Sequence, residues 1–365
     1  TRLSGYMFEN ALTAGLTSSG MNVLLLGPVP TPAVGLLTNS MRADLGIMIS
    51  ASHNEHNDNG IKFFGPDGYK LSDSVEVEIE ALVSKGVDCV SPENIGRAKR
   101  IDDGRYRYIE RVKSSFPNQM RLDGLKVVID CANGAGYRAA PEVLWELGAE
   151  VVPVGVSPDG RNINLDCGST SPRVAAETVV AHGADVAICL DGDADRVLII
   201  DEKGCSIDGD HFLGMIGSRW LKEGNLAQNT LVSTVMSNMR LETFLNREGI
   251  KLVRTAVGDR YVVEQMRFNG FNLGGEKSGH VVMMDYSTTG DGLMAGLQFL
   301  AEMVRRGEPA SVVGRPFDLA PQKTENITYS GDKNPLDTPS VKKIISESEK
   351  KISGLGRLLV RKSGT

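Results

Sequence analysis

Ile49-Ser50-Ala51-Ser52-His53-Asn54 is the stretch that decides how this chain is organised, and Asn59-Gly60-Ile61-Lys62 follows it closely. The apolar residues 45–49 predict a buried strand, which changes abruptly into serines, a histidine and an asparagine. A serine at the carboxyl end of a strand lies where open α/β sheets carry their active sites. With His53 beside it and Lys62 in the same loop, the serine is a candidate nucleophile or phosphoryl carrier. A polar turn after a strand is the alternative that this stretch leaves open.

The same plan occurs three times along the chain. Residues 20–54, 148–195 and 249–280 each contain a glycine, a short strand, a turn, a helix, an apolar strand and a polar loop. Alternating strands and helices predict parallel, doubly wound sheets. Repeated units that each end in a polar loop predict three similar α/β domains around a central cleft.

The C-terminal part has a different pattern. A strand at 326–329, a helix at 340–351 and a strand at 357–361 predict a smaller α+β domain. The expected domains are 1–104, 105–205, 206–318 and 319–365. Because Thr1 is not an initiator methionine and the chain stops directly after Arg361-Lys362-Ser363-Gly364, we expect the first domain to lack its N-terminal part and the last its C-terminal part.

Composition narrows the class of partner. The chain of 365 residues carries a formal net charge of -6, and no basic face is evident that could neutralise a nucleic-acid backbone. No apolar stretch approaches membrane-spanning length and no signal-peptide pattern opens the chain. The five cysteines are scattered and odd in number, which is typical of reduced thiols in a cytoplasm. We therefore expect a cytoplasmic protein that binds neither nucleic acid nor a membrane.

Asp191, Asp193 and Asp195 form the most informative polar loop. In an extended loop alternate side chains share a face, so these three carboxylates can converge on one cation. Ligation by carboxylates alone suits a hard ion, and Mg²⁺ is preferred where a phosphate completes its coordination. An EF-hand is the alternative, because Glu202 falls at the spacing of its last ligand. It fails because Arg196 stands where an EF-hand needs glycine.

A third polar loop contains Glu276, Lys277, Ser278 and His280 between glycines. Donors and acceptors at such close quarters are what a hydroxyl-rich ligand such as a sugar requires, since each buried hydroxyl needs a partner. An exposed turn is the alternative that this loop alone leaves open.

Two further segments carry candidate anion-binding groups. Arg361, Ser363, Gly364 and Thr365 form a basic turn with hydroxyls, which could cradle a phosphate or lie on the surface. Arg260, near a predicted helix start, could reach into the cleft or belong to a helix cap.

Taken together and in this order, the serine loop, the three-aspartate loop, the Glu-Ser loop and the R-x-S-G-T turn resemble the α-D-phosphohexomutase family over residues 2–365. Further stretches resemble the branch of this family that acts on glucosamine phosphates. They are Asn162-Ile163-Asn164 with Cys167-Gly168-Ser169-Thr170, and Thr288-Thr289-Gly290-Asp291-Gly292.

The resemblance implies a role for each candidate residue. Ser52 would be the phosphoserine carrier and would hold one Mg²⁺ per subunit together with Asp191, Asp193 and Asp195. His53 and Lys62 would transfer a proton or stabilise the phosphate. The residues implied to contact substrate are Arg196, Arg260, Glu276, Ser278, His280, Arg361, Ser363, Gly364 and Thr365, the last four at the non-reacting phosphate.

The resemblance also implies an activity. The enzyme would interconvert glucosamine 6-phosphate and glucosamine 1-phosphate through a bisphosphate intermediate, and so supply UDP-N-acetylglucosamine for cell-wall synthesis. A mutase acting on mannose or glucose phosphates and a non-catalytic sugar-phosphate sensor are the alternatives. The partner would be a small sugar phosphate, and the assembly a homodimer.

Overall fold

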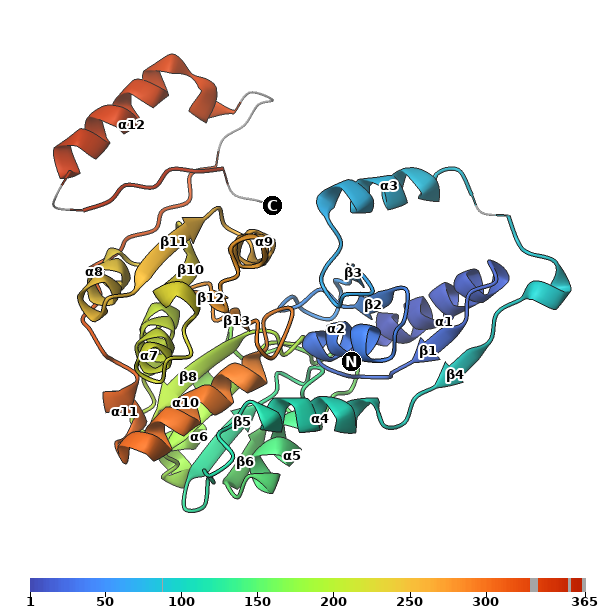
Figure 1. Ribbon diagram of the computed structural model, residues 1–365, viewed down its shortest axis with the longest axis horizontal. Helices are drawn as coiled ribbons and strands as arrows, with labels where there is room; N and C mark the ends of the chain where they lie inside the picture. Colours follow the sequence, from blue (N-terminus) through green and yellow to red (C-terminus); the bar gives the residue numbers. More distant parts are fainter. Residues whose placement is uncertain (87, 329–333, 354–355, 363–365) are drawn as a thin grey trace.

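The computed structural model describes residues 1–86, 88–328, 334–353 and 356–362. Figure 1 shows three α/β units, in blue to cyan, green, and yellow to orange, followed by a C-terminal segment in red. The elements of the first unit are α1 (Leu3–Ser18), β1 (Val23–Leu25), α2 (Thr31–Ser40), β2 (Gly46–Ile49), β3 (Ile61–Phe64), α3 (Asp73–Val83), η1 (Pro92–Asn94) and β4 (Ala98–Arg100).

The middle and third units follow without a long linker. The middle unit contains α4 (Gly104–Ser114), β5 (Lys126–Asp130), α5 (Ala139–Glu146), β6 (Glu150–Val154), α6 (Arg173–His182), β7 (Val186–Leu190), β8 (Val197–Asp201) and β9 (Ser206–Ile207). The third contains α7 (Gly209–Lys222), η2 (Ala227–Asn229), β10 (Thr230–Thr234), α8 (Met239–Glu248), β11 (Lys251–Thr255), α9 (Asp259–Asn269), β12 (Leu273–Gly275), β13 (Val281–Met283), α10 (Gly292–Arg306) and α11 (Ala310–Val313). The C-terminal segment contains η3 (Pro335–Asp337) and α12 (Pro339–Ile352).

The sheets are mixed rather than wholly parallel. The middle unit has a five-stranded sheet in the order β6-β5-β7-β8-β9, in which β5 pairs in parallel with β6 and β7 while β8 and β9 run antiparallel. The four-stranded sheet of the third unit has the order β11-β10-β12-β13, and β13 is antiparallel. In the first unit β1 pairs in parallel with β4, and β2 pairs antiparallel with β3.

The three functional loops share one local geometry. Each connects a strand to the antiparallel strand beside it: β2 to β3, β7 to β8, and β12 to β13. The α/β class and the three similar units are therefore confirmed, but the prediction of parallel pairing is wrong for the strand that follows each loop. Each loop is the connection of a hairpin, so the two paired strands on either side hold its ends close together.

Strand β7 shows why the middle sheet forms at this position. All five of its residues are buried, as expected for a strand covered on both faces. Its alternate side chains enter two different clusters: Ile188 lies in the main core with residues of α10, and Cys189 packs with residues of α6. Helices therefore cover both faces, and the aspartate loop after β7 projects from the edge of this layered structure.

The main hydrophobic core crosses the boundaries between units. It includes Phe64 of β3, Tyr108 of α4, Ile188 of β7 and Leu293 of α10, which are all essentially inaccessible to solvent. Because close-packed interiors resist deformation, this shared core fixes the three hairpin loops relative to one another.

One part of the predicted secondary structure is wrong. The strands predicted at 326–329 and 357–361 are absent from the described residues there, whereas the helix between them is present as α12. A strand persists only where a neighbour pairs its backbone, and the described part of the C-terminal segment offers none.

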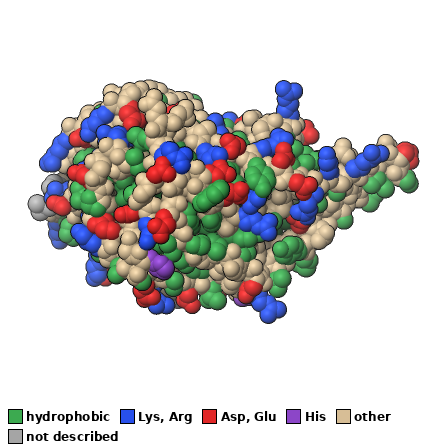
Figure 2. Space-filling view, turned by 90° about the horizontal axis from the view of Figure 1, so that it is seen from below, with side chains coloured by type: hydrophobic (Ala, Val, Ile, Leu, Met, Phe, Trp, Pro, Cys, Tyr) green, Lys and Arg blue, Asp and Glu red, His purple; other side chains and the backbone are tan. Residues whose placement is uncertain are grey.

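On the face shown in Figure 2, positive and negative side chains are interspersed. In the described part of the chain, no helix combines the length and apolar character needed to cross a membrane.

Candidate active site

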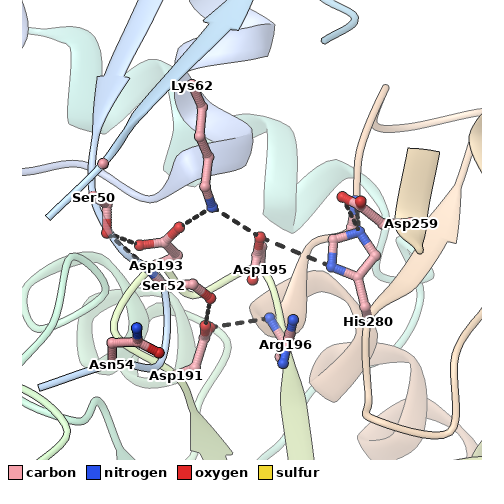
Figure 3. A network of polar contacts seen from close by, with 12 residues as sticks. Ser50, Ser52, Asn54, Lys62, Asp191, Asp193, Asp195, Arg196, Asp259 and His280 are labelled. Atoms are coloured by element: carbon pink, nitrogen blue, oxygen red, sulfur yellow. Dashed lines mark hydrogen bonds and ion pairs between the residues drawn. The ribbon is translucent and has the colours of Figure 1, made fainter. Parts of the chain in front are cut away.

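The first and second hairpin loops meet at Ser52 (Figure 3). The Ser52 hydroxyl donates a hydrogen bond to Asp191 Oδ2 at 2.7 Å, and the Ser50 hydroxyl donates to Asp193 Oδ1. Ser52 has φ 50°, in the left-handed region that few residues other than glycine adopt. Backbone strain of this kind is concentrated at functional sites, where surrounding contacts maintain it.

Gly192 allows the two loops to come this close. A Cβ atom placed at this glycine would lie 2.7 Å from the carbonyl oxygen of Ser52 and 2.8 Å from Asn164 Nδ2. Both separations are shorter than real side chains tolerate, so the position between the first two aspartates requires glycine.

The three aspartates of the second loop are almost completely buried. Asp191, Asp193 and Asp195 are 1%, 0% and 3% exposed. Burial, together with the charges of Asp195 and Asp193, raises the pKa of Asp191 to about 8. Burial would also raise the pKa of Asp195, but the positive charge of Lys62 and the His280 ring outweigh it and lower that pKa. Three carboxyl groups are thus buried in one loop, where burial and their mutual repulsion oppose the ionisation of Asp191.

Lys62 supplies the nearest positive charge. Its ammonium group forms an ion pair with Asp193 and lies 3.7 Å from Asp195 Oδ2. Burial alone would lower the pKa of this ammonium, but Asp193 and Asp195 outweigh burial and hold the pKa above its ordinary value. Lys62 therefore stays protonated at neutral pH and can stabilise negative charge, but it cannot act as a base.

A divalent cation fits the chemistry of this loop. Among the described residues, no three His, Cys, Asp or Glu side chains are already arranged as a metal site, since Asp193 is turned toward Ser50 and Lys62. Asp195 Oδ1 is nevertheless buried without a hydrogen-bond partner, and the donors are all hard oxygens. The expected EF-hand ligand Glu202 instead accepts a hydrogen bond from the Ser311 backbone N–H at 3.0 Å, so that alternative has no support.

His53 lies on the exposed side of the serine loop. Partial burial, and next the positive charge of Arg196, lower the pKa of its ring. The imidazole is therefore neutral near pH 7 and able to accept a proton. Arg196 immediately precedes β8, and its backbone N–H donates to Asp191 Oδ1 at 3.2 Å.

The third hairpin loop joins the second through the backbone. Arg196 and His280 form an antiparallel bridge, and the Val197 N–H donates to the carbonyl of Gly279 at 3.0 Å. Glu276 is half-buried and accepts a hydrogen bond from the Gly258 N–H at 3.2 Å. Ser278 is exposed and lies 3.5 Å from Glu276 Oε2, so these two side chains are accessible to a ligand.

His280 differs from the other residues of this loop because it is buried. Its Nδ1 lies 3.8 Å from Asp195, and its Nε2 lies 3.6 Å from Asp259 and accepts from the Gly290 N–H at 3.1 Å. At 2% exposure the ring has little surface to offer a sugar. Any role of His280 in substrate binding must therefore pass through its two aspartate neighbours.

Arg260, which belongs to the third unit, forms ion pairs with residues of the first unit. Its guanidinium forms ion pairs with Asp73 and Glu76 of α3, the second at 2.9 Å. Lys70 of the first unit and Asp259 of the third form a second ion pair between the two units. The side chains of both ion-paired groups line a cavity of about 300 Å³, which Lys62 also lines. Arg260 thus borders the cavity that Lys62 lines, and its partners there are acidic side chains.

The predicted phosphate turn is only partly described. The Arg361 guanidinium donates to the carbonyl of Lys362 at 3.2 Å, which does not join it to the cluster around Ser52. Ser363, Gly364 and Thr365 lie outside the described residues.

Two residues of the site were missed by the sequence interpretation. Arg2 and Asn164 both donate hydrogen bonds to carbonyl oxygens of the serine loop. Asn164 lies in a stretch that supported the family resemblance, whereas no local pattern around Arg2 indicated a contact with residues 50 positions away.

Comparison with protein families gives three successive matches. The models described as phosphoglucomutase/phosphomannomutase alpha/beta/alpha domains I, II and III match residues 1–88, 106–204 and 208–316.

Two curated proteins match over the whole length of this chain. The phosphoglucosamine mutase of Ruegeria sp. (strain TM1040) is 70% identical over 365 residues, covering 100% of this chain and 82% of that protein. The phosphoglucosamine mutase of Roseobacter denitrificans is also 70% identical, with 100% and 81% covered.

Solved structures of similar fold include a phosphoglucomutase/phosphomannomutase family protein from Burkholderia thailandensis, with TM-score 0.74, 25% identity, and 86% of this chain and 69% of that chain covered. The Aspergillus fumigatus N-acetylphosphoglucosamine mutase in complex with GlcNAc-6P and magnesium has TM-score 0.56 and 19% identity, with 78% and 76% covered. At that identity the likeness concerns the fold alone.

Proposed function

This chain belongs to the α-D-phosphohexomutase family, and from that premise we propose that it interconverts glucosamine 6-phosphate and glucosamine 1-phosphate. It is an intramolecular phosphotransferase of the isomerase class. The observation that carries the proposal is the Ser52 hydroxyl, held 2.7 Å from Asp191 where the hairpin loops meet. The 70% identity with curated phosphoglucosamine mutases over the full chain supports the choice of sugar.

The first step is a phosphoryl transfer from phospho-Ser52 to the free hydroxyl of the sugar monophosphate. The bond from Ser52 Oγ to phosphorus breaks as the bond from the sugar oxygen forms, and the hydroxyl loses its proton. His53 is the proposed acceptor of that proton, because the lowered pKa keeps its ring neutral. Lys62 remains an ammonium and stabilises the negative charge of the transferring group.

The second step returns a phosphoryl group to the enzyme. The sugar bisphosphate reorients within the site, and its other phosphate is transferred to Ser52 Oγ, which restores phospho-Ser52. The sugar oxygen that loses this phosphate takes back the proton held by His53, and the isomeric monophosphate is released. In this proposal Glu276 and Ser278 hold ring hydroxyls in both orientations, with Arg196, Arg260 and His280 at the border of the sugar site. Arg361 with Ser363, Gly364 and Thr365 binds the phosphate that is not reacting.

Mg²⁺ is the proposed cofactor, held by Asp191, Asp193, Asp195 and the phosphoserine. When bound, it supplies positive charge that stabilises the transferring phosphoryl group. The buried carboxylates with an unpartnered oxygen on Asp195 support this choice. A cytoplasmic location and a homodimer remain predictions from the sequence.

The test compares turnover of the glucosamine, glucose and mannose 6-phosphates by the wild-type chain and by Ser52→Ala. We expect the highest kcat/KM on glucosamine 6-phosphate, one added phosphate on the wild-type protein by intact mass, and neither turnover nor added phosphate in the variant. A faster reaction with another sugar phosphate would assign the chain to a different mutase. Normal turnover by Ser52→Ala would refute the phosphoserine mechanism, and binding without turnover in the wild-type chain would favour a sensor.

A further inference from the structure

The backbone of the serine loop is held from outside the loop itself. The carbonyl groups of Ser52 and Asn54 each accept hydrogen bonds from two side chains that belong to other segments. Since Ser52 has a left-handed φ of 50°, its Oγ position depends on contacts that maintain this unfavourable conformation.

Arg2 is the first of these side chains. It is 3% exposed and immediately precedes α1. Its Nη2 donates to the Ser52 carbonyl at 3.1 Å and to the Asn54 carbonyl at 2.7 Å, while its Nη1 donates to Ser50 Oγ at 3.0 Å. The planar guanidinium therefore spans three points of the loop, which a lysine could not do.

Asn164 is the second, and it comes from the unit that carries the aspartates. Its Nδ2 donates to the Ser52 carbonyl at 2.9 Å and to the Asn54 carbonyl at 2.7 Å. Asn164 is 7% exposed, and its own φ of 58° is left-handed. Its backbone N–H donates to the carbonyl of Ala132 at 2.9 Å, so the side chain is anchored to the turn after β5.

We propose that Arg2 and Asn164 form a carbonyl clamp that fixes the direction of the Ser52 side chain for phosphoryl transfer. Both are positioning residues, because their contacts reach carbonyl groups and Ser50 rather than Ser52 Oγ. Asn164 connects the serine loop to the sheet that presents Asp191, so the clamp holds the phosphoryl carrier and the carboxylates in register. This inference rests on the proposed function.

The clamp makes a distinct prediction for kinetics. Misplacing a reacting group by about 1 Å can cost on the order of 10²-fold in rate, while ground-state binding of the sugar uses the third loop. Loss of either clamp residue should therefore lower kcat about 10- to 100-fold and leave KM for glucosamine 6-phosphate within about twofold.

Asn164→Gly is the informative variant, because glycine accepts the left-handed backbone and no charge is added near the aspartates. Asn133→Gly is its matched control. Asn133 also has a left-handed φ, 48°, but its side chain bonds to Asn162 and Ser157 rather than to the serine loop. Arg2→Lys is an independent second variant, because it keeps the positive charge and removes the two guanidinium nitrogens that donate to the serine loop.

The measurements are kcat, KM and the thermal midpoint of each variant with Mg²⁺ and a sugar bisphosphate activator present. We expect a large loss of kcat in Asn164→Gly and Arg2→Lys, and near wild-type kcat in Asn133→Gly. Lower thermal midpoints with unchanged kcat in both clamp variants would overturn the inference and leave only a structural contact. If one clamp variant fails to fold, the kcat of the other decides.

The clamp and the proposed function can fail separately. A wild-type chain without mutase turnover, or an active Ser52→Ala variant, would refute the proposed function. A wild-type chain that is active and dependent on Ser52, with clamp variants of normal kcat, would refute the clamp alone.

Discussion

Gly192→Ala is the substitution whose effect follows most directly from the structure. The new Cβ would lie 2.7 Å from the Ser52 carbonyl oxygen and 2.8 Å from the side chains of Ile163 and Asn164. An ordinary contact begins near 3.4 Å, so the serine loop and the aspartate loop must separate by about 3.4 − 2.7 = 0.7 Å. Since the obstructing atom is a backbone carbonyl, a rotamer change cannot relieve the clash.

This separation has two measurable consequences. Overpacking of a well-packed region costs about 1–3 kcal/mol of folding stability. A displacement of roughly 0.7 Å between the phosphoryl carrier and the carboxylates should also lower kcat by about 10- to 100-fold. Chemical denaturation and steady-state turnover of glucosamine 6-phosphate measure the two effects.

Gly15→Ala is the control for this substitution. Gly15 is exposed within α1, and a Cβ there would meet nothing within 4 Å. Alanine should therefore stabilise the protein by about 0.5–1 kcal/mol and leave kcat unchanged. Wild-type kcat in Gly192→Ala would refute the idea that close approach of the two loops is needed for catalysis.

Two further predictions concern the buried Asp291 and the third loop. Burial raises the pKa of Asp291 to about 7, from an ordinary value of 3.8. Between about pH 4 and pH 7 the folded state therefore holds a proton that the unfolded chain has released, so stability falls across this range and levels off above it. Asp291→Asn, which retains a capping oxygen for α10, should flatten the fall in thermal midpoint between about pH 4 and pH 7. An equally steep fall in the variant would assign the pH dependence to another group. Glu276→Ala should lower kcat/KM by roughly one to two orders of magnitude in both directions, since losing a buried partner typically costs about 1–3 kcal/mol. A loss in one direction only would contradict the use of one loop for both orientations of the sugar.

The site loops could be found from the sequence because each follows a buried strand with an abrupt change in polarity. The aspartate loop is the clearest case: β7 is apolar throughout, and the acidic side chains begin at the next residue. The change from an apolar strand to polar residues is enough to place these side chains at the edge of a sheet. Because the same unit occurs three times, the three polar loops could also be expected to lie close together.

The direction of the following strands could not be predicted in the same way. The residues of β8, Val197–Asp201, are apolar except for Asp201 and are mostly buried, and such a run is compatible with parallel or antiparallel pairing. Direction is decided by the length of the connection, which here allows a hairpin. The strands expected at 326–329 and 357–361 are wrong for a related reason. The β-propensity of a segment does not show whether another strand is available to pair with it.

Site residues that act through contacts far apart in the sequence could not be predicted. Arg2 lies 48 to 53 positions before the residues that it contacts, and Asn164 lies 110 to 112 positions after them. Nothing in a window around either residue distinguishes it from an ordinary polar residue near a turn. Only the packing of one unit against the next brings their donors to the same two carbonyls.

The arrangement of three hairpins also explains how one site can serve two opposite transfers. The proposed phosphoryl carrier lies on the first hairpin, the carboxylates on the second and the proposed sugar contacts on the third. Because the shared core and the bridge between Arg196 and His280 hold these three loops together, the loops need not rearrange while the bisphosphate reorients. The protein groups that act on the 1-phosphate are then the same groups that act on the 6-phosphate. A substitution that displaces Ser52 should therefore slow both half-reactions by the same factor, whereas one that weakens a single substrate contact need not.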